Sequence, residues 1–441
     1  MKTRLDIIIR VVGAVVMLVA FLVIVAIYGL WNQPVPKHPP NVRLSPLAPP
    51  ISRSELTTNN AAFYYLKAAE QIVDYEQPKA SHDEMEAVLG GDLSGDFAAL
   101  EQTLKDCAVP LYLLRQGAAL KSCQMPGLDN LQEYFGLQQL KLLGQLESCS
   151  GRLALRDGNF EEMVKSDLTL IQFGDDCTKG GPYLAAGLGY LSHYYGCSGL
   201  RSAVSTGSPT TNSIKSVIQC LGELRNGSQP TAELLRYHRL FIEQVFETSV
   251  LTNKVSPVEI RDTCDAAFGD FIQEAEKPFW LADVEKLLKK WDVTRQPKWR
   301  LILNRRRLLL IPLSMDIAAV TIYQKGVARH DTEMEATMTV CALRGFTLTH
   351  GKPPERLSEL VPEFLASVPI DPFDGKPMRY RREGDGWVLW SVGSDRKDDN
   401  AECHEYKYRK KYPDTEGGDI YFKSTESQDD LQYYLKTKKP R

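Results

Sequence analysis

A long apolar stretch lies near the start of the chain. Between Val11 and Trp31 there are 21 residues without a charge, and as a helix they would span about 30 Å, the hydrocarbon thickness of a bilayer. Three cations lie in the ten residues before this stretch, and such cations favour the cytoplasmic side. The pattern therefore predicts a single-pass transmembrane helix over residues 7–31, in contact with membrane lipid, after a cytoplasmic tip of residues 1–6.

A cleaved signal peptide is the alternative interpretation of this segment. Such peptides have an apolar region of about 7 to 15 residues that ends at a small-x-small site, and no clean Ala-x-Ala follows Trp31. We therefore predict a retained signal anchor in a bacterial inner membrane, with the bulk of the chain periplasmic. The prolines of residues 32–52 predict a semi-rigid spacer, because proline fixes φ and removes an amide donor.

The middle of the chain has the periodicity of helices. From residue 53 to about 330, apolar residues recur at intervals of three and four and alternating patterns are scarce, which is typical of amphipathic helices. Candidate helices cover residues 130–156, 159–174, 184–204, 212–224, 231–250, 281–291 and 299–328. We expect a mainly α protein with an α-helical domain, bundle or repeat-like, over residues 53–330.

One segment of this domain has a more particular pattern. The residues from Leu153 to Met163 resemble the turn between the two helices of a tetratricopeptide repeat, with an aromatic, Phe160, soon after Gly158. The match covers about one unit, and no second copy follows at a period of 34 residues. A generic antiparallel helical hairpin explains the segment equally well.

The pattern changes from about residue 331. A helical stretch ends at Gly351, and residues 378–382 and 387–393 then alternate between apolar and polar around a turn at 383–386. Alternation on both sides of a glycine-rich turn predicts an antiparallel hairpin. We expect a small α+β module with an antiparallel sheet over residues 331–425, followed by a polar tail, residues 426–441.

This module carries three short motifs in a fixed order. They are P-x-D-P-F-x-G-x-P-x-x-Y from Pro369 to Tyr380, S-x-G-x-D from Ser391 to Asp395, and G-D-I at residues 418–420. Together they resemble the globular end of the major pseudopilin of bacterial type II secretion. The start of the chain lacks the basic leader, cleavage site and intrahelical glutamate of that family, so polymerisation into a pilus is not implied.

The resemblance implies a calcium ion in a loop after the hairpin. By position, Asp395 and Asp419 match the carboxylate ligands, and Asp398 and Asp399 are nearby oxygen donors. Calcium coordinates several oxygens and tolerates irregular loops. The loop between these residues, 400–417, carries several cations that oppose a divalent ion, so a metal-free, solvated acidic loop is the alternative.

Charge and composition narrow the functional classes. A formal charge of -3 provides no field that would hold a nucleic acid. The nine cysteines include no CxxC pair, and most lie in apolar helical contexts where a buried thiol acts as a small hydrophobe.

No catalytic motif is present either: the phosphate loop, the dinucleotide fingerprint, the GxSxG elbow and HExxH are all absent. We therefore assign no catalytic or cofactor-binding residues other than the calcium ligands. We expect a membrane-anchored, non-enzymatic interaction or scaffold protein with unidentified protein partners. The alternatives are a membrane-anchored hydrolase with a site in the helical domain and an accessory subunit of a secretion or pilus-like machine.

Overall fold

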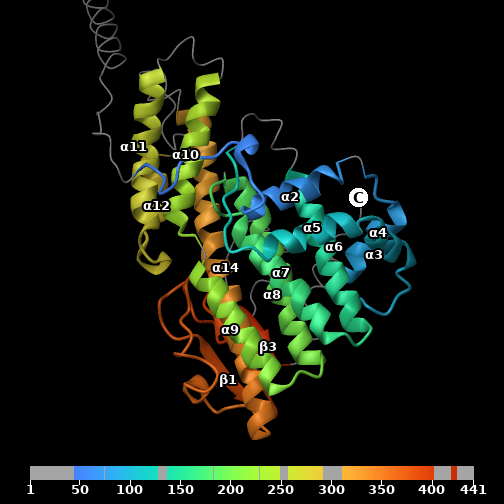
Figure 1. The fold of residues 1–441 in the computed structure, drawn as a ribbon. Coiled ribbons are helices and arrows are strands. Elements are labelled where there is room, and N and C mark those ends of the chain that lie inside the picture. The colour runs from blue at the N-terminus through green and yellow to red at the C-terminus, as the bar shows by residue number, and fades with distance from the viewer. Residues whose placement is uncertain are drawn as a thin grey trace, which may run out of the picture. The chain divides into compact units, whose positions relative to one another are not determined.

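The computed structural model shows a chain that is mainly helical, with one small antiparallel sheet (Figure 1). It forms two compact units. The first unit contains residues 1–45, 239–274 and 283–322, and the second contains residues 46–238, 275–282 and 323–441. The residues that the structure describes are 44–73, 75–127, 137–181, 183–227, 229–248, 257–291, 310–401 and 419–424.

The predicted fold class needs one correction. Its mainly helical body and its small sheet are present, but none of the helices in the described part of the chain is long and apolar enough to cross a membrane. The longest of them, α14 (Leu310–His350), carries charged residues at nearly every turn between Lys325 and Glu335. The transmembrane helix expected at residues 7–31 lies outside the described residues.

The first unit is built from helices that are joined by ion pairs. Arg239 Nη1 lies 2.6 Å from Asp265 Oδ1, and Arg261 Nε lies 2.6 Å from Glu243 Oε1. Buried apolar side chains such as Phe268 form its core. Its helices are α11 (Pro257–Ala275), α12 (Val284–Trp291) and parts of α10 (Thr231–Thr248) and α14.

The second unit begins with helices in the order that the periodicity predicts. The candidates 159–174, 184–204 and 212–224 are confirmed as α7, α8 and α9, with ends that differ by one to three residues. The candidate 299–328 is wrong at its C-terminal end, because α14 continues to His350. The side chain of Asn159 caps the start of α7 by accepting a hydrogen bond from Glu162 N. In chain order the helices are α2 (Ala61–Glu70), α3 (Lys79–Leu89), α4 (Ala98–Asp106), α5 (Ala108–Ala118), α6 (Leu137–Arg156), α7 (Phe160–Asp176), α8 (Tyr183–Thr206) and α9 (Thr211–Gly227).

Residues 46–51 of the expected spacer lie against this unit. Leu47 N donates to Glu233 Oε1 at 2.6 Å, and the hydroxyl of Tyr237 donates to Ala48 O at 2.7 Å. Prolines have no amide to donate, but their carbonyls still accept, as Pro49 O does from Gln124 Nε2 at 2.7 Å. This proline-rich stretch is therefore held by its remaining polar groups.

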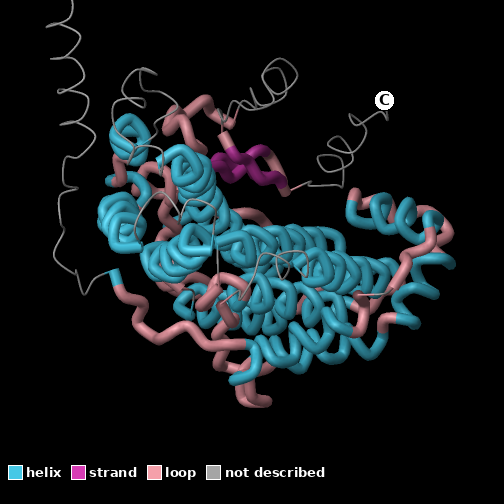
Figure 2. The backbone as a smooth tube through the Cα atoms, turned by 90° about the horizontal axis from the view of Figure 1, so that it is seen from above, coloured by secondary structure: helices cyan, strands magenta, loops and turns pink. Residues whose placement is uncertain are grey.

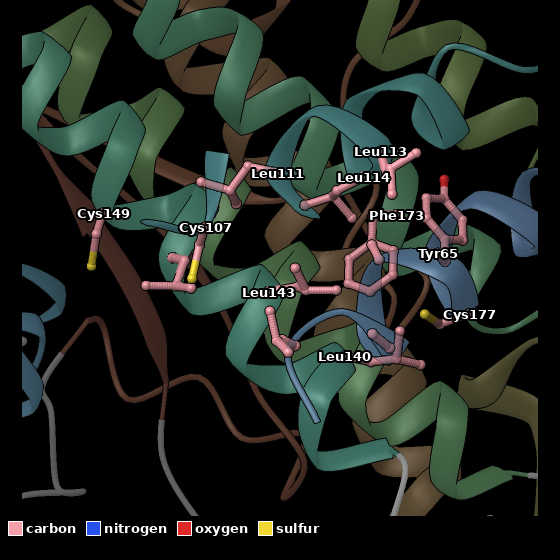
Figure 3. Close-up of a cluster of buried hydrophobic side chains, with 14 of the residues drawn as sticks. Tyr65, Cys107, Leu111, Leu113, Leu114, Leu140, Leu143, Cys149, Phe173 and Cys177 are labelled. Carbon is pink, nitrogen blue, oxygen red and sulfur yellow. The ribbon is translucent and has the colours of Figure 1, made fainter. Parts of the chain in front are cut away.

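A leucine-rich core joins helices α2, α5, α6 and α7 (Figure 3). Tyr65 and Phe173 meet edge to face at its centre, with ring centroids 4.8 Å apart. The hydroxyl of Tyr65 donates to Asp176 Oδ2 at 2.7 Å. A buried phenol usually finds such a partner, so the aromatic pair also fixes the polar end of α7.

Helices α7 and α8 lie side by side along most of their length (Figure 1). Glycines allow this close approach: a Cβ placed on Gly189 would lie 2.3 Å from Gly174 O, and one on Gly196 would lie 2.5 Å from Asp167 O. Real Cβ atoms do not approach so closely, so these positions accept only glycine without a shift of the backbone.

The sheet consists of three short strands, β1 (Arg379–Glu383), β2 (Gly386–Ser391) and β3 (Ile420–Lys423), in the order β1-β2-β3. The predicted hairpin is confirmed, because β1 and β2 pair antiparallel with Glu383 opposite Gly386. Figure 2 shows the strands (magenta) against one side of the helices. Leu389 and Phe422 pack there with buried side chains of α8, α9 and α14.

Candidate functional site

The first motif of the C-terminal module forms a clamp around Asp371, whose side chain is fully buried. Its Oδ1 accepts hydrogen bonds from Phe373 N at 3.0 Å and from Ser391 Oγ at 2.8 Å. Its Oδ2 accepts from Val392 N at 2.9 Å and from Arg379 Nη1 at 2.8 Å. The aspartate of P-x-D-P-F thus ties its own loop to the S-x-G-x-D segment about 20 residues further on, which is a structural role.

Arg379 links this clamp to the loop that follows the hairpin. Besides Asp371, its guanidinium donates to both carboxylate oxygens of Asp374, and its Nε lies 3.6 Å from Asp398 Oδ2. The hydrogen bonds and charge of Arg379 hold the pKa of Asp374 below its ordinary value although burial opposes this. One cation therefore orients three aspartates at the base of the candidate calcium loop.

Among the four expected calcium ligands, Asp419 is the buried one, with 1% of its surface exposed. Its Oδ2 accepts hydrogen bonds from Asp399 N at 3.1 Å and Ala401 N at 2.8 Å. Its Oδ1 is buried and has no hydrogen-bond partner among the residues that the structure describes. Burial raises the pKa of Asp419, and the charges of Asp398 and Asp399 add to this against the two backbone hydrogen bonds.

The other expected ligands have different surroundings. Asp398 Oδ1 accepts from Trp390 Nε1 at 2.9 Å and from Asn400 N at 3.0 Å. Asp395 Oδ1 accepts from Lys397 N at 3.1 Å, two residues further on. The structure therefore brings Asp398, Asp399 and Asp419 together, whereas the contact of Asp395 is a local turn.

The donor set fits a hard cation in part. Carboxylate oxygens are the ligands that calcium prefers, and the orphaned Oδ1 of Asp419 is a buried oxygen that still needs a partner. Within the described ranges, however, no group of three or more His, Cys, Asp or Glu side chains is arranged to hold a metal ion. Residues 402–418 of the same loop lie outside these ranges.

A second set of titratable groups lies inside the helices of the second unit. The rings of His193 on α8 and His330 on α14 stack with centroids 3.6 Å apart. His330 Nε2 lies 3.8 Å from Asp175 Oδ1, and Cys197 Sγ lies 3.6 Å from His193 Nδ1. On the same helices Arg201 Nη1 lies 2.7 Å from Glu333 Oε2.

Titratable side chains therefore converge in the helical domain, where the hydrolase alternative places its site. Burial lowers the pKa of His193 well below its ordinary value, and the neighbouring His330 and Arg201 lower it further. A neutral imidazole is a competent base, but a base must reach its substrate. His193 is 1% exposed, so in this structure the stacked rings serve as packing and as internal partners.

Sequence reasoning assigned no role to Asp371 or to the histidine pair. Asp371 stood inside the quoted motif, and a buried aspartate next to proline is a usable signal for a loop clamp. His193 lies between glycines that face α7, where helical periodicity places it on the buried side of α8. Neither signal reveals the partner, because Ser391 and His330 are distant in sequence.

Comparison of the whole chain with protein-family models, with curated proteins and with solved structures finds no match. The resemblance of residues 331–425 to the pseudopilin module, and that of the α6–α7 turn to a tetratricopeptide hairpin, therefore stay predictions. The turn itself is a helical hairpin in which Gly158 has a φ of 78°.

Proposed function

We propose that this protein is a non-enzymatic interaction or scaffold protein whose C-terminal module is stiffened by a calcium ion. Asp419 carries the proposal. It is a buried carboxylate just before β3, with one oxygen bound to the backbone of residues 399 and 401 and the other without a partner among the described residues. An acceptor left in this state costs about 1–3 kcal/mol, and a bound cation removes that cost.

Asp419 would hold the ion through its Oδ1, which has no hydrogen-bond partner among the described residues. Asp398 and Asp399 of the adjoining turn would supply further oxygens only after their side chains shift, because the described residues do not already group three carboxylates around an ion. When bound, calcium supplies positive charge among these carboxylates and links β3 to the turn. Burial raises the pKa of Asp419, and the charges of Asp398 and Asp399 add to this. Protons therefore compete with the cation, and its affinity should decrease as the pH falls.

Isothermal titration of the chelator-treated, full-length chain with calcium chloride tests this proposal. We expect about one ion per chain. Partners outside the first coordination shell alone are worth about 10- to 100-fold in metal affinity, so Asp419→Asn should weaken binding at least that much. Asp385→Asn provides the control, because Asp385 is an exposed carboxylate in the hairpin turn and should bind like the parent.

Limited proteolysis separates a loss of calcium binding from a loss of folding in the variants. Calcium should protect residues 331–425 from cleavage in the parent chain and in Asp385→Asn, but not in Asp419→Asn. Without calcium all three chains should be cleaved alike, which shows that Asp419→Asn still folds. Equal affinity of the two variants, or no heat of binding by the parent, would remove calcium from the proposal.

The scaffold role rests on the helical body and makes a separate prediction. A pull-down from cells with and without a calcium chelator should recover the same partner set more weakly when calcium is removed. Recovery of secretion-machine components would instead favour the accessory-subunit alternative. The periplasmic location and the lipid contact of residues 7–31 stay predictions, which a reporter fused to the C-terminus would test.

A further inference from the structure

Asp167 is a buried carboxyl group in the middle of α7, and 1% of its surface is exposed. It faces α8 at Gly199: a Cβ built on this glycine would lie 2.2 Å from Asp167 Oδ1. The absence of a side chain at Gly199 is what makes room for the carboxyl group. Neither carboxyl oxygen of Asp167 has a hydrogen-bond partner among the described residues.

Two more buried polar atoms near Asp167 also lack a hydrogen-bond partner among the described residues. Arg152 and Glu147 lie on α6, and their charges act on Asp167 in opposite directions. Arg152 Nη2 and Glu147 Oε2 are buried and also lack a partner in the described part of the chain. Four such atoms, one donor and three acceptors, are thus contributed by three neighbouring side chains of two adjacent helices.

Glu147 and Arg152 each have another side-chain atom that is already hydrogen-bonded. Glu147 Oε1 receives Arg115 Nε at 2.9 Å and Ser166 Oγ at 2.9 Å. Arg152 Nε lies 3.4 Å from Ser148 Oγ. Glu147 is thus held by Arg115 of α5 and Ser166 of α7, and Arg152 by Ser148 of its own helix α6.

Burial raises the pKa of Asp167 well above its ordinary value, with Arg152 opposing and Glu147 adding to this effect. A neutral carboxyl group has an O–H to donate as well as oxygens that accept. In either protonation state it needs a partner, because a buried polar group without one costs about 1–3 kcal/mol. Protonation alone therefore leaves the arrangement unsatisfied.

We propose that Asp167, Arg152 and Glu147 form a buried hydration site, in which internal water bridges the carboxyl group of α7 to the two charged side chains of α6. Water suits the site because it both donates and accepts, and the free atoms are of both kinds. Buried waters typically make about three hydrogen bonds to otherwise unsatisfied groups, which four unpartnered atoms can supply. A cation would meet the guanidinium of Arg152, and an anion would meet Glu147.

A crystal structure of the full-length chain, at a resolution that shows ordered water, tests the site directly. We expect density for at least one water within hydrogen-bond distance of both Asp167 and Arg152. The same density should persist in Asp167→Asn, since an amide also donates and accepts. It should be lost in Asp167→Leu, whose side chain has no polar atom.

Three results would overturn the proposal. One is a dry space in the parent chain. Another is a direct ion pair between Arg152 and Asp167, which would satisfy both without water. The third is a metal ion at this position, recognised by its anomalous signal. If Asp167→Leu does not fold, the comparison between the parent and Asp167→Asn still decides, because both must show the water.

Discussion

Replacement of Asp371 by asparagine should destabilise the C-terminal module and increase its local opening. The carboxylate accepts four hydrogen bonds, two at each oxygen, from Phe373 N, Ser391 Oγ, Val392 N and Arg379 Nη1. Asparagine has nearly the same shape but only one oxygen, and its NH₂ group donates. If the amide turns its NH₂ group toward Val392 and Arg379, two donors face a third donor. If it turns toward Phe373 and Ser391, only the Phe373 amide does, because the Ser391 hydroxyl can also accept.

The cost follows from these contacts. A buried donor without a partner costs about 1–3 kcal/mol, and more when it is charged. Asp371→Asn therefore loses about 3–5 kcal/mol if the amide turns its NH₂ group toward Val392 and Arg379, since the guanidinium then lacks one of its carboxylates. At 1.4 kcal/mol per factor of ten, the equilibrium constant for opening of the module rises about a hundred- to several-thousandfold.

Hydrogen exchange followed by mass spectrometry measures this opening locally, which matters because a chain with two compact units need not unfold in one step. Peptides that cover residues 369–393 and 419–424 should exchange faster in Asp371→Asn by up to the factor above. Peptides from α6 and α7 should exchange at the parent rate, because local openings have their own free energies.

Asp385→Asn is the matched control for this prediction. Asp385 lies in the turn between β1 and β2 and is exposed, so the same chemical change there should leave exchange unaltered. The reasoning would be refuted by unchanged exchange around Asp371 in Asp371→Asn, or by equal acceleration in both variants.

Three further predictions concern the helices. Gly199→Ala should destabilise the second unit by about 1–3 kcal/mol, because its Cβ would meet Asp167 at 2.2 Å. Gly187→Ala, with nothing within 4 Å of its Cβ, should stabilise the second unit by about 0.5–1 kcal/mol. Thermal unfolding that finds Gly199→Ala at least as stable as Gly187→Ala would contradict this account of the packing. Burial raises the pKa of Asp167, so above about pH 4 the unfolded parent releases the carboxyl proton of Asp167 and the folded parent keeps it. Asp167→Asn should therefore gain stability over the parent as the pH rises, by up to about 1.4 kcal/mol per pH unit. A stability difference that is independent of pH would show that Asp167 is ionised in the folded chain. Burial lowers the pKa of His193, so as the pH falls the unfolded chain protonates this imidazole before the folded chain does. The free energy of unfolding should therefore decrease below about pH 6.5. Chemical denaturation at pH 7 and pH 5 should show a smaller decrease in His193→Gln than in the parent.

The helices show how much local pattern alone can predict. Residues 159–174, 184–204 and 212–224 were expected as helices and form α7, α8 and α9. The extent of each helix follows from apolar residues spaced three and four positions apart and from end signals such as the N-cap Asn159. The same applies to the hairpin, since a glycine at a φ of 62° in its turn is a local requirement that sequence displays directly.

The fold class as a whole could not be read from such patterns. An apolar run predicts a membrane helix only through its composition, and the described residues contain no helix suited to cross a membrane. The start of α14 was expected to belong to a different segment from residues 331–350, yet one helix spans Leu310–His350.

The candidate sites show the same division. The resemblance to the pseudopilin module implied four aspartates as ligands in one acidic loop. Only the tertiary structure distinguishes Asp419, which is buried with one oxygen unpaired among the described residues, from Asp395, which closes a local turn. Burial and partner depend on which distant segments fold against a residue, and no local period encodes that.

The sequence by itself determined where helices and strands form, because backbone hydrogen bonding and side-chain periodicity act between near neighbours. Tertiary structure alone decided which polar groups are satisfied. Asp371 and Asp167 are both aspartates inside the protein, yet one accepts four hydrogen bonds and the other accepts none from described residues. The physical reason is that a carboxyl group's energy depends on the charges, donors and solvent around it, and folding brings these together from distant parts of the chain.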